Sequence, residues 1–200
     1  MSAAIIVVDM QNGFVHPEGS VARLGMELVD REAVIQENAA MVEEARRFGV
    51  PIVYTRHVHR PAYLDAPPLV RERFTEVQGL LAGTWDAEVH DALAPQPGDA
   101  IVDKNRYDAF LYTDMEVVLR ALGATSLLVT GVATNVCVES TARAADMRDF
   151  KVSVAIDCTS TTAEFHENAL HAMAGLDMNV VPWRDALATM MTAGGALAPV

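Results

Sequence analysis

The sequence predicts an α/β fold, a three-layer sandwich in which a mostly parallel, doubly wound sheet of about six strands lies between two layers of helices. Two observations support this prediction. Short apolar runs alternate with longer segments of helical periodicity, as in repeated β-α units. The runs are also continuously apolar, which is typical of strands that helices bury on both faces. Such Rossmann-like sheets bind ligands beyond the carboxyl ends of their strands.

The elements in the first half of the chain follow from simple signals. A fully apolar run predicts a strand at 3–9, and apolar residues at helical spacing predict a helix at 30–48, which ends before Gly49. A second apolar run predicts a strand at 50–55. Several prolines and glycines interrupt the stretch 56–91. A connection this long is usually functional, so we expect it to form a lid or a pocket wall.

The second half repeats the alternation. A strand is predicted at 99–104, after the breaker sequence that runs from Pro95 to Gly98, and a helix at 113–122, which ends before Gly123. A strand at 126–130, a helix that includes Cys137, a strand at 151–157, a helix at 163–174 and a short strand at 178–181 complete the series.

The bulk composition fits one domain. The chain has 200 residues, of which 51% are hydrophobic and 21% charged, which is enough for one full core but not for two. We therefore interpret residues 1–200 as a single domain whose Ala- and Gly-rich end, 192–200, is a frayed tail. The formal charge of −12 argues against nucleic-acid or anionic-membrane partners, because both would repel the chain.

Cysteine usage indicates the compartment. The two cysteines, Cys137 and Cys158, lie in different predicted elements, whereas a secreted disulfide scaffold would contain more, so we expect a reducing cytoplasm. The apolar opening segment lacks a basic region and reaches Asp9 too early for a signal peptide or a spanning helix.

Cys137 occupies the most informative position in the chain. It follows an apolar strand and the turn at Gly131, where the next helix is expected to begin. The unpaired N–H groups of a first helical turn carry partial positive charge, which favours a thiolate over a thiol. The position therefore predicts an activated sulfur, although a lone cysteine in a helix is commonly just a small buried hydrophobe.

Two further reactive side chains end predicted strands. Asp9 closes the first strand and Lys104 the third, so a parallel sheet would bring both to the same edge as Cys137. A carboxylate there can accept the thiol proton, and an ammonium can stabilise the thiolate. Taken singly, an aspartate at a strand end is commonly a turn residue and a lysine is commonly solvated. We therefore base the catalytic hypothesis on the three together.

Three sequence blocks resemble a known family. Residues 8–14, 103–110 and 131–141 are similar to the three signature blocks of the isochorismatase-like cysteine hydrolases. The third block is most similar to that of ureide and N-carbamoyl amidohydrolases, among them ureidoacrylate amidohydrolase, biuret hydrolase and N-carbamoylsarcosine amidase. The resemblance implies that Asp9 is the general base, Lys104 its electrostatic partner and Cys137 the nucleophile. It also implies a cis peptide before Ala133, whose N–H would form an oxyanion hole with that of Cys137.

The resemblance also implies a reaction. A small polar amide or ureide would be cleaved at its C–N bond through a thioester, and ammonia or an amine would be released, without a cofactor. Family members commonly form homo-dimers or tetramers, so we expect an oligomer. Three alternatives stay open: hydrolysis of a vinyl ether, as in isochorismatases that can dispense with the cysteine; a nicotinamidase activity; and a non-catalytic binding protein.

Candidate substrate-binding residues lie in or near the same blocks. Arg106 fits a substrate carboxylate or polarised carbonyl in a bidentate way, although a surface salt bridge is an equal alternative. The aromatic residues Phe14, Trp85, Tyr107 and Phe110 are candidates for pocket walls, or else pack in the core. Thr134 and Asn135, just before the cysteine, complete the substrate-binding set.

The histidines suggest little metal chemistry. His57 and His59 follow the second strand, where nicotinamidases carry an Asp-x-His metal pair, but an aspartate is missing here. We expect the two rings to hydrogen-bond and shape the pocket rather than to hold zinc, which usually takes three protein ligands in a catalytic site. His166 and His171, in the predicted helix at 163–174, are expected to be surface or packing residues.

Overall fold

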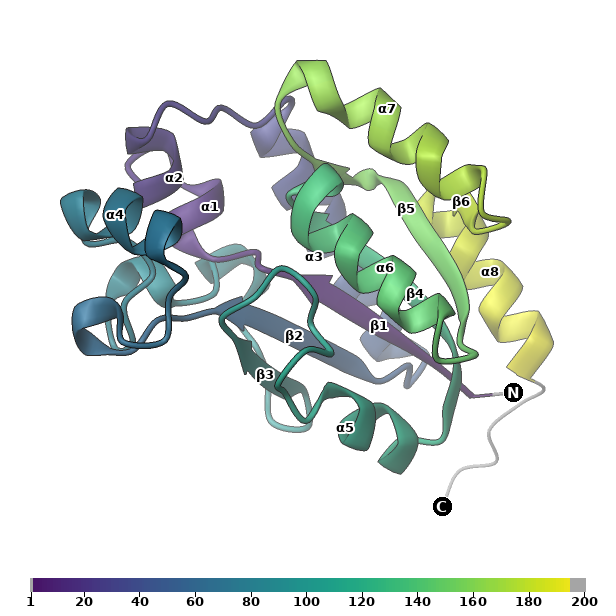
Figure 1. The fold of residues 1–200 in the computed structure, drawn as a ribbon. Coiled ribbons are helices and arrows are strands. Elements are labelled where there is room, and N and C mark those ends of the chain that lie inside the picture. Colours follow the sequence, from purple (N-terminus) through teal and green to yellow (C-terminus); the bar gives the residue numbers. More distant parts are fainter. Residues whose placement is uncertain (1, 195–200) are drawn as a thin grey trace.

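A six-stranded parallel sheet with the order β3-β2-β1-β4-β5-β6 forms the centre of the computed structural model, which describes residues 2–194 (Figure 1). The strands are β1 (Ser2–Val8), β2 (Ile52–His57), β3 (Ala100–Lys104), β4 (Ala124–Val132), β5 (Lys151–Ser160) and β6 (Asn179–Val181). All neighbouring strands pair in parallel. This order confirms the predicted doubly wound sheet, and its direction of winding reverses between β1 and β4.

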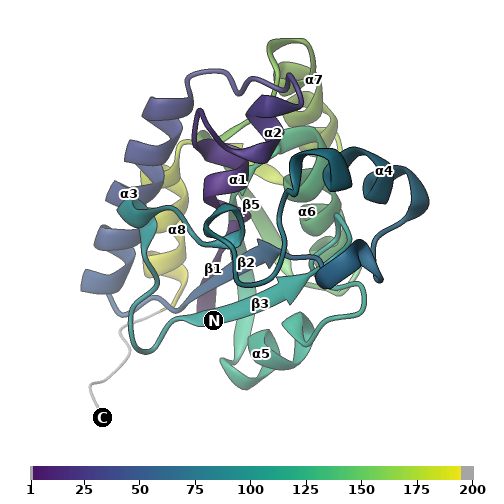
Figure 2. The same ribbon diagram turned by 90° about the vertical axis from the view of Figure 1, so that its left-hand side faces the viewer.

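Helices cover both faces of the sheet. Those of the described residues are α1 (Asn12–Val15), α2 (Ser20–Arg23), α3 (Arg31–Arg47), α4 (Pro68–Val77), α5 (Met115–Ala121), α6 (Glu139–Asp146), α7 (Ala163–Ala174) and α8 (Trp183–Gly194). Figure 2 shows α3 and α8 on one side of the strands and α5, α6 and α7 on the other. Within 2–194, none of the helices has the length and apolar character needed to cross a membrane.

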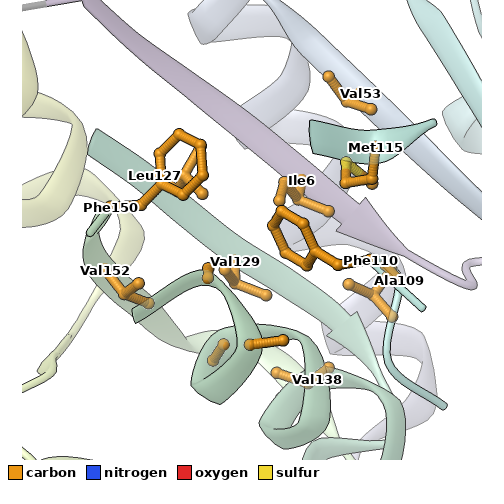
Figure 3. Close-up of a cluster of buried hydrophobic side chains, with 14 of the residues drawn as sticks. Ile6, Val53, Ala109, Phe110, Met115, Leu127, Val129, Val138, Phe150 and Val152 are labelled. Carbon is orange, nitrogen blue, oxygen red and sulfur yellow. The ribbon is translucent and has the colours of Figure 1, made fainter. Parts of the chain in front are cut away.

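The central strand β1 is buried on both faces. Ile6 and Val8 belong to a core cluster with residues of α5, α6 and α7, which Figure 3 shows in part. Ile5 and Val7 belong to a second cluster with residues of α3 and α8. Successive side chains of a strand point to opposite faces, so a continuous apolar run is what this position requires.

Several boundaries differ from those predicted. Strand β2 begins at Ile52 and runs on to His57, which pairs with Lys104 in β3. Helix α8 was not predicted, and the frayed tail predicted from 192 onward is wrong for 192–194, which belong to α8. The helix forms because side chains at a spacing of three or four residues, among them Trp183, Leu187 and Met190, are buried against the sheet. The rest of that tail, 195–200, lies outside the described residues.

The stretch 56–91 folds into short elements beyond the carboxyl ends of the strands, next to α1 and α2 (Figure 1). It contains α4 and the 3₁₀ turns η1 (Pro61–Tyr63) and η2 (Trp85–Ala87), and a third turn, η3 (Asp91–Leu93), follows it. The buried carboxylate of Asp86 joins this stretch to α2, since it accepts hydrogen bonds from Ser20 and from the N–H of Leu80. Helix α4 buries none of its own residues.

Candidate active site

The residues of the candidate site lie at the carboxyl ends of four neighbouring strands, β3, β2, β1 and β4. Asp9 follows β1, His57 ends β2, Lys104 ends β3, and Cys137 lies in η4 (Thr134–Val138), the turn after β4. Ligand atoms of Asp9, His57 and Cys137 lie within 4.8 Å of one another, and Lys104 Nζ is 2.7 Å from Asp9 Oδ2. The structure thus brings the three predicted catalytic side chains together at the reversal between β1 and β4, where ligands of such sheets bind.

A buried network positions the Asp9–Lys104 ion pair. The hydroxyl of Thr55 donates to Asp9 Oδ1 at 2.6 Å, and Lys104 Nζ also donates to the carbonyl of Arg106 at 3.0 Å. Both charged side chains are fully buried, and such a pair is tolerated only when further hydrogen bonds satisfy its polar atoms. Thr55 is not among the residues predicted for the site, although a polar residue at the end of an apolar strand is a usable signal.

A second missed residue, Gln11, fixes the two strand ends relative to each other. Its side-chain amide donates to the carbonyls of His57 and Ala87 and accepts from the N–H of His57. Because the residue is fully buried, these bonds meet no competition from water. Gln11 therefore holds the end of β2 and the turn η2 against the segment that carries Asp9.

Burial and the neighbouring charges act on the Cys137 thiol in opposite directions. Burial raises the pKa of the Cys137 thiol to about 12, the Lys104 ammonium acts to lower it, and Asp9 acts to raise it. Cys137 lies in a π-type turn, and the α-helix α6 begins only at Glu139. The sulfur therefore lies before the α-helix rather than in its first turn, and burial favours the protonated thiol. A thiol in this form becomes a nucleophile when a neighbouring base accepts its proton.

The charge of Lys104 persists despite burial. Burial acts to lower the pKa of Lys104, but the charge of Asp9, followed by the interaction with the Cys137 sulfur, outweighs this effect and raises it. An ammonium is thus maintained beside the sulfur, where it can stabilise a thiolate as that charge forms.

The backbone at the end of β4 has an unusual conformation, and it approaches β1 too closely for a side chain at position 131. The Val132–Ala133 peptide bond is cis, as the family resemblance implies. Gly131 has a φ of 99°, and a Cβ atom there would stand 2.1 Å from the carbonyl oxygen of Val8. A side chain at this position would push β4 away from β1 and so separate the strands that carry Cys137 and Asp9.

Three of the predicted substrate-binding residues surround His57. The rings of Phe14 and Tyr107 lie 6.3 Å and 6.4 Å from the His57 ring, centroid to centroid. Arg106 donates from Nη1 to the carbonyl oxygens of Asp65 and Asn105. Its positive charge also contributes, after burial and the charges of Lys104 and His59, to holding the pKa of His57 well below its ordinary value.

The other predicted side chains have different contacts. Trp85 is half exposed and packs edge-on against His16, and Phe110 packs in the core near Phe150. Thr134 Oγ1 lies 3.0 Å from His166 Nδ1, and Asn135 Oδ1 accepts a hydrogen bond from Thr161. Thr134 and Asn135 thus engage the start of α7 and the residues before it. His166, expected at the surface or in packing, contacts the turn that carries Cys137.

His57 and His59 share no third potential metal ligand among the described residues. Both rings are buried, and burial lowers the pKa of each, which favours the neutral form of the ring. Among the residues described, the one group that could hold an ion combines His57 with Asp9 and Cys137 and leaves His59 out. The Lys104 ammonium, 2.7 Å from Asp9, would repel a second cation at that place.

A cavity of about 330 Å³ adjoins the ion pair. Its lining residues are Val58, His59, Arg60, Asp65, Ala82, Asp103, Lys104, Asn105 and Tyr112. Cys137 is 2% exposed and does not line it, so a substrate that enters here reaches the sulfur only when neighbouring side chains move. A larger hollow of about 940 Å³ lies between α1 and the start of α3, but none of the three reactive residues lines it.

Known proteins resemble the chain over nearly all of its length. The isochorismatase domain family matches residues 3–191. The ureidoacrylate amidohydrolase RutB of Methylobacterium radiotolerans is 37% identical over 169 residues, which cover 78% of this chain and 66% of that protein. The chain thus spans just under two thirds of the length of this relative.

Solved protein structures also resemble that of the chain. An isochorismatase family protein from Desulfovibrio vulgaris superposes with a TM-score of 0.84 at 29% identity, covering 94% of this chain and 98% of the other. A cysteine hydrolase from Pseudomonas syringae superposes with a TM-score of 0.82 at 31% identity, covering 96% and 93% of the two chains.

Proposed function

This chain is a hydrolase of the isochorismatase family, and we propose that it cleaves the C–N bond of a small polar amide or ureide with Cys137 as nucleophile. The observation that carries the proposal is the buried cluster in which a thiol, a carboxylate and an ammonium meet at the edge of the sheet. The name of its relative RutB, ureidoacrylate amidohydrolase, supports a ureide as the substrate class.

The first half of the reaction acylates the sulfur. As Cys137 Sγ attacks the carbonyl carbon, its proton passes to the Asp9 carboxylate, and the N–H groups of Ala133 and Cys137 receive the negative charge that develops on oxygen. Protonated Asp9 then gives the proton to the departing nitrogen. The C–N bond breaks, and ammonia or an amine leaves an S-acyl group on Cys137.

The second half restores the enzyme. A water molecule loses a proton to Asp9 as it attacks the S-acyl carbon, the C–S bond breaks, and the sulfur recovers the proton from Asp9. The acid product carries the oxygen of the water. Lys104 keeps its charge throughout and stabilises the anion on sulfur or on Asp9, whichever is present.

The surroundings of the cluster favour a substrate with an electron-rich polar group. Lys104 and Arg106 supply positive charge, while the lowered pKa values of His57 and His59, which burial chiefly causes, keep both rings neutral near pH 7. A guanidinium or ammonium can hold a carboxylate or a ureide oxygen. Phe14 and Tyr107, next to His57, supply apolar walls.

An ammonia-release screen tests the proposal. The purified protein would be incubated with ureides, N-carbamoyl amino acids, simple amides and nicotinamide, with and without a chelator. We expect ammonia from a ureide or N-carbamoyl compound at a rate that the chelator leaves unchanged. Ammonia from nicotinamide alone, with loss of activity in chelator, would contradict the substrate class. Turnover of a vinyl ether that survives Cys137→Ala would contradict the covalent route.

Two further properties belong to the same proposal. Both cysteines are buried and unpaired, which supports a reducing compartment, and we assign the enzyme to the cytoplasm. Large apolar side chains are exposed at Leu64, Leu69 and Tyr112, which supports a homo-oligomer. Analytical ultracentrifugation tests the second assignment, and a sedimenting monomer at micromolar concentration would contradict it.

A further inference from the structure

The turn η4 that carries Cys137 is held from outside the sheet by two side chains. His166, on α7, contacts Thr134 Oγ1 through Nδ1 at 3.0 Å. Thr161, just before α7, donates to Asn135 Oδ1 at 2.7 Å. Both bonds reach the first two residues of the turn, which connect the cis peptide at Ala133 to Cys137.

The bond to His166 satisfies a buried group. Thr134 is fully buried, and a buried hydroxyl without a partner costs free energy. The partner is a polar side chain on the outer layer rather than a backbone group of the turn itself. Position and orientation of the turn are therefore linked to the position of α7.

His166 connects α7 to the turn η4, so a shift of the residue would move the turn. It lines a hollow of about 540 Å³ along α7, together with Asp157, Leu170 and His171, so one side of the residue faces this hollow while Nδ1 reaches Thr134. Reacting groups tolerate little displacement, since a shift of about 1 Å can lower a rate by about 10². A small rotation of η4 would move Cys137 relative to Asp9 and Lys104, which are fixed to other strands.

We propose that His166 is a positioning residue of the reaction: through its hydrogen bond to Thr134 it sets the orientation of the turn that presents Cys137 and the N–H of Ala133. The inference rests on the proposed function. It differs from a merely structural role, because its loss should lower kcat at a nearly unchanged KM, beyond the stability lost when the buried Thr134 hydroxyl loses its partner. Asparagine carries a donor and an acceptor close to where Nδ1 stands, so it should replace the histidine in part.

The kinetic test compares three variants with wild type on a substrate found by ammonia release. In His166→Ala we expect kcat to fall about tenfold, as for loss of one positioning hydrogen bond, with KM within about twofold of wild type. His166→Asn should recover most of kcat. His171→Ala is the matched control, because His171 is exposed on the same helix and lines the same hollow, and it should behave as wild type.

A double-mutant comparison adds the partner. Thr134→Val should lower kcat, and adding His166→Ala to it should cost no further activity, because the same bond is already lost. Equal kcat in His166→Ala and His171→Ala, or additive losses in the double variant, would overturn the inference.

A second readout separates this inference from the proposed function. The rate at which iodoacetamide labels Cys137, followed by peptide mapping, needs no substrate. If wild type hydrolyses no amide or ureide, the proposed function fails, whereas a labelling rate that changes in His166→Ala but not in His171→Ala would still support the positioning role. Identical labelling rates in the two variants would contradict it.

Discussion

Cys137 and Cys158 are both buried in the same domain, yet their surroundings differ in the way that matters for chemistry. Burial raises the pKa of both thiols. Around Cys158 the next contributions, from Asp157 and Glu37, raise the pKa further, and Arg184 opposes them only weakly. Beside Cys137, by contrast, Lys104 lowers the pKa and Asp9 is close enough to accept the proton.

In the proposed mechanism, these surroundings distinguish the reactive thiol, Cys137, from the structural one, Cys158. Burial alone makes a thiol inert, because the charged form loses its hydration. A fixed cation stabilises the thiolate that burial disfavours, and a fixed base accepts the thiol proton. Both groups come from strands other than the one that precedes the sulfur. The following predictions test that difference, and each uses a matched position elsewhere in the chain.

Replacement of the two cysteines should separate them most clearly. We expect Cys137→Ala to lower ammonia release by at least about 10³-fold, as is typical when a nucleophile is removed, while the fold is retained. Cys158→Ala should keep turnover near that of wild type and lose only some stability, because a buried side chain becomes smaller. Equal activity in the two variants would contradict the assignment of Cys137 as nucleophile.

Removal of the cation should be the next largest effect. Lys104→Met leaves the Asp9 carboxylate buried without its partner, so the free energy of unfolding should fall by about 3–5 kcal/mol in urea titrations. Arg56→Met is the control: Arg56 lies on β2 and pairs with Asp103, which is half exposed, so its loss should cost less than about 1 kcal/mol. Equal losses would mean that Asp9 and Lys104 form no buried pair in solution.

His57, which lies beside the cluster, should have a smaller effect on the free energy of unfolding, and this effect should depend on pH. Burial, followed by the charge of Lys104, holds the pKa of His57 well below its ordinary value of 6.5. Below pH 6.5 the unfolded chain therefore binds a proton that the folded chain does not, so stability is complete above this pH and declines as the pH falls toward the folded pKa. Between pH 7.5 and 5.5 the free energy of unfolding should fall on the order of 1 kcal/mol through this residue.

The control for this effect is again His171. The pH-dependent loss should be smaller in His57→Gln, whereas His171→Gln should match wild type because His171 is exposed. Urea titrations at the two pH values measure both. An unchanged loss in His57→Gln would show that His57 is not held neutral in the folded protein.

Much of the site could be predicted because parallel strands end at one edge. Asp9 and Lys104 each end an apolar run, and that alone brings them to the edge where Cys137 follows β4. The raised pKa of Cys137 could not be predicted, because it depends on how completely the surrounding layers exclude water. The contact between His166 and Thr134 joins residues 32 positions apart and exists only through the packing of α7.

Other misses had a local signal. The buried face of α8 repeats at three- and four-residue intervals through Trp183, Leu187 and Met190, a period that sequence alone displays. Thr55 ends the strand run predicted at 50–55, so its hydroxyl could have been placed at the same edge as Asp9. Gln11 had no such signal, since its three hydrogen bonds reach backbone groups of distant segments.

The most direct test of the account labels both thiols in one sample. The folded enzyme would be treated with iodoacetamide at pH 7, 8 and 9, and peptide mapping would give a rate for each cysteine, with urea-unfolded protein as the reference for equal access. We predict that Cys137 reacts at least about tenfold faster than Cys158 and speeds up about tenfold per pH unit without a plateau, as a pKa of about 12 requires. Equal rates at the two cysteines, or faster labelling of Cys158, would contradict it.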